Sequence, residues 1–144
     1  MAEPTSPIVY DLTKQPLPAK VDTTQTKDSD GFYYRQGDFV EIAGDETVKV
    51  SASGNGIGVL LTSIHENQAP NGLDSRHRVA VLTPFKAVVK ATANGAIAAG
   101  DAVKVTGNKA VKIDPSSATV ADALAKIGVC WKGGADGAEV WILV

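Results

Sequence analysis

Residues 37–44 read GDFVEIAG, and residues 100–107 read GDAVKVTG. The two stretches align without a gap at an offset of 63 residues, and the same offset places VKV at 48–50 opposite VKI at 111–113. Each stretch begins with a Gly-Asp turn, continues through alternating residues and ends at a glycine turn that reverses the chain. This pattern predicts a β-hairpin that is used twice.

The similarity extends beyond the hairpins. IGV at 57–59 matches IGV at 127–129 at an offset of 70 residues, and VAVL at 79–82 parallels VWIL at 140–143. We therefore expect one repeated β unit, an internal duplication over 37–82 and 100–143. The alternative is that two unrelated β-meanders share turn residues by chance. One such unit has little core of its own, so the two halves are expected to pack into one barrel or sandwich.

Seven additional residues in the second half predict a short helix. Thr119 can cap it together with Asp122, and one face of it carries Val120, Leu124 and Ile127. Elsewhere, short valine-rich runs separated by glycine turns indicate strands. We expect a mostly β fold, a compact β-barrel domain over residues 31–144 with this one helix.

Residues 1–30 differ from the rest of the chain. They contain four prolines and a polar stretch without periodicity, which predicts an extended N-terminal arm. Its only apolar cluster is Ile8, Val9 and Tyr10, a candidate contact with a partner. We expect the arm to drive attachment and to contribute little to the fold; the alternative is an inert leader.

Charge and composition limit the possible partners. The 14 basic and 16 acidic residues give a net charge of -2, which does not favour nucleic acid binding. The N-terminus lacks the basic and apolar regions of a signal peptide, and no apolar run approaches the length of a membrane helix, so we expect a soluble protein without a membrane partner. The single cysteine excludes an intramolecular disulfide, which suits assembly in a reducing cytoplasm.

Motifs for chemistry are weak. The glycine-rich stretch 54–58 precedes a strand, whereas a phosphate loop follows one, and the chain contains no Gly-Lys-Ser or Gly-Lys-Thr. His65 and His77 flank the loop 66–76 without the spacing of zinc ligands, and Cys130 lacks a nucleophile signature. Asp38 and Asp101 are expected to cap their own turns. We predict no catalytic, cofactor or metal site, and no enzyme activity.

The C-terminal hairpin carries both tryptophans. Trp131 shares a face with Val129, and Trp141 shares one with Leu143, while the opposite face of the last strand is also apolar. A strand that is apolar on both sides is either the centre of a sheet or part of a subunit interface. Trp131 and Trp141 therefore join the candidate interaction residues.

Several sequence segments of residues 31–144 resemble those of the capsid decoration, or cement, proteins of bacteriophages. They are GVLLT at 58–62, VAVLTPF at 79–85, AIAAGDAV at 96–103 and the closing hairpin that starts with GV at 128–129. The resemblance implies a β-tulip-like barrel that trimerises on the major capsid protein lattice, at the outer surface of a virion assembled in the host cytoplasm. It implies no active site. The long arm and the insertion at 66–76 depart from the family pattern.

The residues leave two other functions open. One is a carbohydrate- or ligand-binding β module that uses exposed aromatics such as Tyr33, Tyr34 or a tryptophan. The other is a small hydrolase that uses Cys130 and a histidine. Coplanar exposed aromatics would favour the first, and contact between the cysteine and a histidine would favour the second.

Overall fold

A computed structural model describes residues 7–53 and 55–144. The chain divides into two compact units. Unit 1 contains the described residues up to Gln15 together with Phe85–Val144, and unit 2 contains Pro16–Pro84. The mostly β fold with a closed barrel and one short helix is confirmed.

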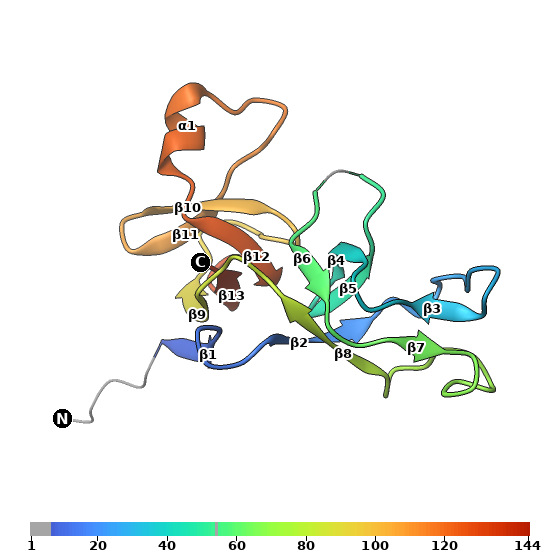
Figure 1. Cartoon of the computed structure of the whole chain (residues 1–144). Coiled ribbons are helices and arrows are strands. Elements are labelled where there is room, and N and C mark those ends of the chain that lie inside the picture. The colour runs from blue at the N-terminus through green and yellow to red at the C-terminus, as the bar shows by residue number, and fades with distance from the viewer. Residues whose placement is uncertain (1–6, 54) are drawn as a thin grey trace. The chain divides into compact units, whose positions relative to one another are not determined.

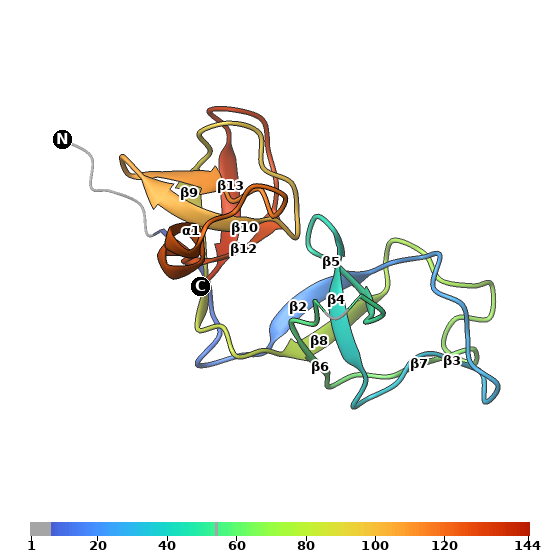
Figure 2. The same cartoon turned by 90° about the horizontal axis from the view of Figure 1, so that it is seen from above.

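Unit 2 is a closed five-stranded barrel of strand order β2-β5-β4-β6-β8 (Figure 1). Its strands are β2 (Leu17–Val21), β4 (Phe39–Gly44), β5 (Thr47–Val50), β6 (Gly58–Leu60) and β8 (Arg78–Leu82). All pairs are antiparallel except β2 and β5, which are parallel. A separate two-stranded ribbon, β3 (Phe32–Tyr34) with β7 (Ile64–His65), extends from the barrel (Figure 2).

Unit 1 contains a six-stranded sheet of order β1-β9-β13-β12-β10-β11. Its elements are β1 (Ile8–Asp11), β9 (Ala87–Thr92), β10 (Ala102–Thr106), β11 (Lys109–Lys112), helix α1 (Val120–Ala125), β12 (Gly128–Lys132) and β13 (Glu139–Leu143). A parallel bridge between Ala93 and Ala110 joins the end of β9 to β11. The five strands β9-β13-β12-β10-β11 therefore form a ring with the same connections as the barrel of unit 2.

The two units agree residue by residue in their pairing. Val40 pairs with Gly58 as Val103 pairs with Gly128, and both valines are fully buried. The turns that precede these strands also agree, because Gly37 and Gly100 have φ angles of +95° and +91°. Such angles favour glycine, which has no Cβ. Val40 and Val103 thus occupy equivalent strands, while the origin of the two units by duplication stays a prediction.

The expected alignment of 48–50 with 111–113 is wrong by one residue. Ile42 pairs with Val48, and its counterpart Val105 pairs with Ala110, which is an offset of 62 residues for the second hairpin strand. The reason is a bulge between Ile42 and Gly44 in the first hairpin. The second hairpin instead closes on a two-residue turn in which Gly107 and Asn108 both have positive φ angles.

We expected the two halves to pack into one barrel or sandwich, and they do not form one barrel. Every strand ladder of the described residues joins strands of one unit, and each ring closes by itself. The core of unit 1 is a cluster of small and aliphatic side chains: Ala93, Ile97, Val103, Ala110, Cys130, Val140 and Ile142. No helix in the described part of the chain is long and apolar enough to cross a membrane.

The N-terminal segment contributes more to the fold than the sequence suggested. Within residues 1–30, β1 pairs with β9 and β2 is a strand of the unit 2 barrel. Leu17, Ala19 and Val21 are buried, because alternate residues of β2 face the barrel interior. The expectation that this arm adds little to the fold is therefore wrong for Leu17–Val21. Residues 1–6 lie outside the described residues.

Candidate functional site

The predicted apolar cluster of the arm lies on β1. Ile8 pairs with Val89 and Tyr10 pairs with Val88, with a bulge between them at Val9. Backbone hydrogen bonds close both ends of this short ladder: Lys90 N donates to the carbonyl of Pro7 at 2.7 Å, and Leu12 N donates to that of Lys86 at 2.9 Å. Ile8 remains 50% exposed. The cluster thus pairs with the chain's own unit 1 and keeps part of its apolar surface accessible.

The two tryptophans lie on the neighbouring strands β12 and β13 but differ in exposure. Trp131 is fully buried, and its indole Nε1 has no hydrogen-bond partner in the part of the chain that is described. Trp141 is half-buried, its Nε1 donates to Glu139 at 3.2 Å, and the ammonium of Lys132 lies 4.6 Å from its ring centroid. Because β13 lies between β9 and β12, its two apolar faces fit a central strand. Only Trp141 presents surface to a partner.

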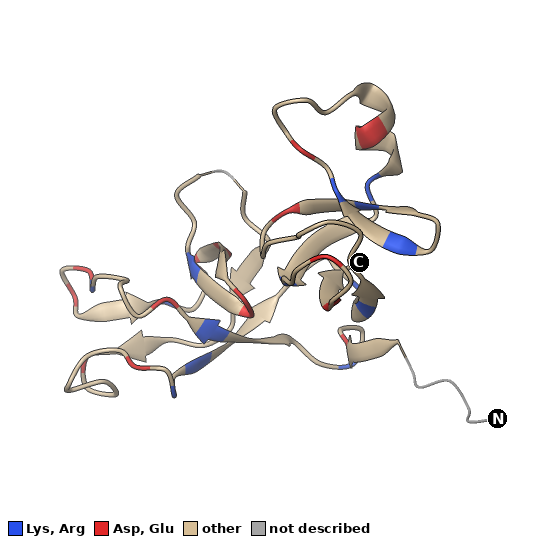
Figure 3. Cartoon of the chain, turned by 180° about the vertical axis from the view of Figure 1, so that it is seen from behind, with Lys and Arg blue, Asp and Glu red and all other residues tan. Residues whose placement is uncertain are grey.

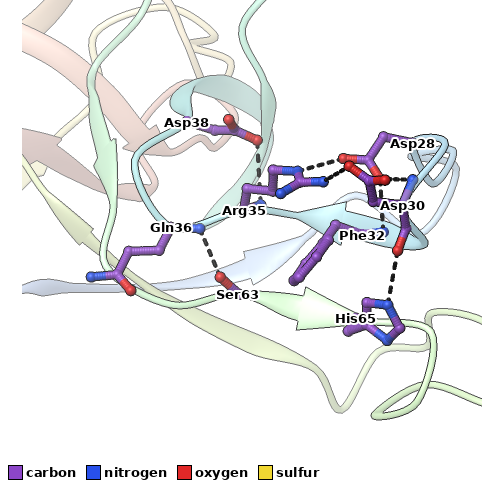
Figure 4. Close-up of polar contacts among 8 residues, drawn as sticks. All are labelled: Asp28, Asp30, Phe32, Arg35, Gln36, Asp38, Ser63 and His65. Atoms are coloured by element: carbon purple, nitrogen blue, oxygen red, sulfur yellow. Dashed lines mark hydrogen bonds and ion pairs between the residues drawn. The ribbon is translucent and has the colours of Figure 1, made fainter.

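The ribbon β3–β7 carries a charged cluster around Arg35 (Figure 4). The guanidinium donates to Asp28 at 2.6 Å and to Asp30 at 2.7 Å, and its Cζ lies 4.2 Å from the centroid of the Phe32 ring. Asp28 also accepts backbone N–H groups of Asp30 and Phe32. The hydrogen bond from Arg35, assisted by these N–H groups, lowers the pKa of Asp28 to about 2.

His65 completes this cluster from the second strand of the ribbon. Its ring packs edge-on against Phe32 at a centroid distance of 4.7 Å, and its Nε2 lies 2.9 Å from the carbonyl oxygen of Asp30. Next to it, Glu66 forms an ion pair with Lys27 at 2.7 Å. The charges of this cluster are paired within it, so its geometry fits a structural role that holds the ribbon in shape.

The candidate catalytic side chains lie in different surroundings. Cys130 belongs to the buried core of unit 1, whereas both histidines belong to unit 2. His77 Nδ1 lies 3.3 Å from Asp74, which also binds Arg76 in the same loop. Among residues 7–53 and 55–144, no group of three or more His, Cys, Asp or Glu side chains is placed to hold a metal ion.

The predicted turn caps are confirmed. The carboxylate of Asp38 accepts the N–H of Arg35 at 3.3 Å, and that of Asp101 accepts the N–H of Ala98 at 2.9 Å. Tyr34, a candidate for ligand stacking, is fully buried, and its hydroxyl donates to the carbonyl of Asp22 at 3.0 Å or of Val48 at 3.2 Å. It closes the barrel of unit 2 instead of presenting a surface.

Sequence reasoning missed an apolar surface on the outside of the unit 2 barrel. Phe39 pairs with Val59, and Val59 pairs with Leu82, so these three side chains form one row across β4, β6 and β8. Phe39 is 67% exposed and Leu82 is 59% exposed. We call these three residues the outer apolar row. The available signal was the alternation of 39–42, which turns Phe39 outward when Val40 faces the core.

Helix α1 presents a second apolar surface. Thr119 and Asp122 form the predicted capping box, and Lys104 of β10 donates to Asp122 at 2.7 Å. The predicted apolar face points to solvent, since Val120 is 78% exposed and Leu124 is 84% exposed. Lys/Arg and Asp/Glu residues are interspersed along both units (Figure 3). The exposed features suited to a partner are therefore apolar.

Comparison with known proteins finds no matching family model and no matching curated protein.

Proposed function

We propose that this chain is a structural decoration subunit that binds the outer surface of an assembled bacteriophage head and stabilises it, acting as a trimer on the major capsid protein lattice. The proposal rests on the sequence resemblance of residues 31–144 and on one structural observation. That observation is the outer apolar row, in which Phe39, Val59 and Leu82 adjoin one another on three hydrogen-bonded strands.

The row suits docking onto another protein. Exposed large apolar side chains that adjoin one another typically mark interaction surfaces. Because the closed barrel already orders their backbone, docking requires little further loss of backbone entropy. The row alone is much smaller than the roughly 800 Å² per partner of a stable interface. Binding through it would thus be weak for one subunit and strong for several subunits linked in a trimer on a repeating lattice.

Co-sedimentation tests the proposal. Purified chain is mixed with empty shells assembled from the major capsid protein encoded in the same genome, and bound protein is measured in the pellet. We expect the wild type to saturate the shells at micromolar concentration. A wild-type chain that stays in the supernatant at tens of micromolar would refute capsid decoration.

A variant pair tests the surface itself. Phe39→Ser with Leu82→Ser removes the two most exposed side chains of the row, and we expect binding to weaken tenfold or more. Val105→Ser is the matched control, because Val105 is 48% exposed but lies on β10 of unit 1. Equal binding by the wild type, the double variant and Val105→Ser would show that the outer apolar row does not contact the shell. Light scattering gives the molar mass of the wild type, alone and when bound to shells, and a trimeric mass is expected.

A further inference from the structure

The edge of β9 in unit 1 differs from the equivalent edge in unit 2. β9 pairs with β13 along one side, and along the other side its first half pairs with β1. In unit 2 the equivalent strand is β2, since Pro18 pairs with Ala80 as Lys90 pairs with Trp141. Beyond Pro18, β2 pairs with β5 only at Lys20 and Val21.

The two edges differ at one equivalent position, which is Lys90 in unit 1 and Pro18 in unit 2. Lys90 N donates to the carbonyl of Pro7, the residue before the added strand β1, whereas the equivalent Pro18 has no N–H to donate. Proline at such a position prevents a further strand from pairing, a device that blocks sheet edges. Unit 2 thus has a blocked edge, and unit 1 has an edge that accepts a strand.

The added strand is not part of the core of unit 1. The core cluster is formed by residues between Ala93 and Ile142, and the ring β9-β13-β12-β10-β11 closes without β1. β1 has four residues, carries a bulge and leaves Ile8 half-exposed. A short, partly exposed edge strand opens at low free-energy cost. β1 can therefore leave β9 while the ring of unit 1 stays closed.

We propose that the β9 edge is a strand-acceptor site and that it takes β1 of a second copy of this chain, producing a strand-exchanged oligomer. The second copy is the fitting partner because its β1 reproduces the observed register, with Ile8 opposite Val89 and the carbonyl of Pro7 on Lys90 N. Residues 12–16 connect β1 to β2 and act as the hinge. Because exchange preserves the β1–β9 contacts, the equilibrium between monomer and strand-exchanged oligomer depends on protein concentration and on strain in the hinge. This inference does not rest on capsid binding.

Disulfide trapping between different chains tests the exchange. One chain carries Ile8→Cys and another carries Val89→Cys; opposed positions of an antiparallel pair lie within reach of a disulfide. The two proteins are mixed in denaturant, refolded together, oxidised and separated on a non-reducing gel. The control replaces Val89→Cys by Val105→Cys, an exposed position on β10 that does not pair with Ile8. The buried Cys130 is present in all samples.

We expect the paired mixture to give several-fold more linked dimer than the control. Adding Lys90→Pro to the Val89→Cys chain removes the N–H that donates to the carbonyl of Pro7 and should reduce that dimer several-fold. Unit 2 shows that its barrel accommodates a proline there, namely Pro18. The proposal is overturned if the mixture matches the control while an Ile8→Cys/Val89→Cys chain links only within itself, or if Lys90→Pro leaves the dimer yield unchanged.

Discussion

Gly58 and Gly128 occupy equivalent positions in the two units. Each lies against a backbone carbonyl group of a neighbouring strand, β8 for Gly58 and β13 for Gly128. A Cβ atom on Gly58 would meet the carbonyl oxygen of Leu82, and one on Gly128 would meet that of Leu143. Backbone cannot move aside as the end of a flexible side chain can. We therefore expect Gly58→Ala and Gly128→Ala each to lower the free energy of unfolding by about 1–3 kcal/mol, measured by chemical denaturation.

Gly44→Ala is the matched control for these two variants. The nearest atom to a Cβ at Gly44 is the Cβ of Thr47 at 3.9 Å, an ordinary van der Waals contact. Its effect should stay within about 0.5 kcal/mol. If all three alanine variants were equally stable, the close approach of strands at Gly58 and Gly128 would not constrain these positions.

Tyr34→Phe should destabilise unit 2 although it removes a single oxygen atom. The hydroxyl of Tyr34 is hydrogen-bonded to the carbonyls of Asp22 and Val48 in a buried position, and the variant leaves these acceptors without that donor. We expect a loss of about 1–2 kcal/mol in the free energy of unfolding. Tyr33→Phe, at the neighbouring and partly exposed position, is the control and should be close to neutral.

Acid should weaken the ribbon β3–β7 through Asp28. Arg35 and two backbone N–H groups hold the pKa of this carboxyl at about 2 in the folded chain, below its ordinary value of 3.8. A lowered folded-state pKa contributes stability that is complete above the ordinary value and is lost as the pH falls towards 2. Asp28→Asn removes this contribution, so its stability should fall less steeply between pH 4 and pH 2 than that of the wild type. Parallel profiles for the two proteins would contradict this prediction.

Two N-terminal deletions should have different consequences. Removing residues 2–11 takes away β1 but leaves both strand rings complete, so the melting temperature should fall by only a few degrees. Removing residues 2–21 also deletes β2, which pairs with both β5 and β8. We expect unit 2 to lose its cooperative unfolding transition in calorimetry. Similar melting curves for the two deletions would show that β2 is dispensable.

Local sequence patterns predicted much of the local structure. The Gly-Asp turns, the hairpin strands and the Thr119–Asp122 capping box depend on neighbouring residues and were found in the structure. The one-residue error in the second hairpin strand arose because a bulge at residue 43 is invisible to an alignment that maximises matches.

Long-range relationships escaped prediction for a different reason. The prolines of residues 1–30 led us to expect an extended arm that adds little to the fold. Pro18 nevertheless lies within β2, at a position where a barrel strand has no need of an N–H on that side. Phe39 was taken for an ordinary strand residue. Alternation with Val40 indicates that its side chain faces outward, but only the completed barrel places it in one row with Val59 and Leu82. Which strands close a ring depends on contacts between distant residues, and these leave no local signature.

In the sequence, unit 2 lies between the two segments of unit 1, and this order has a consequence for folding during synthesis. All strands of unit 2 have been made when the ribosome reaches Pro84, so this barrel can close while the rest of the chain is still being translated. β1 precedes the strands of unit 2 in the chain, but its partner β9 begins only at Ala87. Until β9 has been made, β1 of a nascent chain has no partner strand within its own chain, and this interval favours exchange with a neighbouring chain on the same messenger RNA.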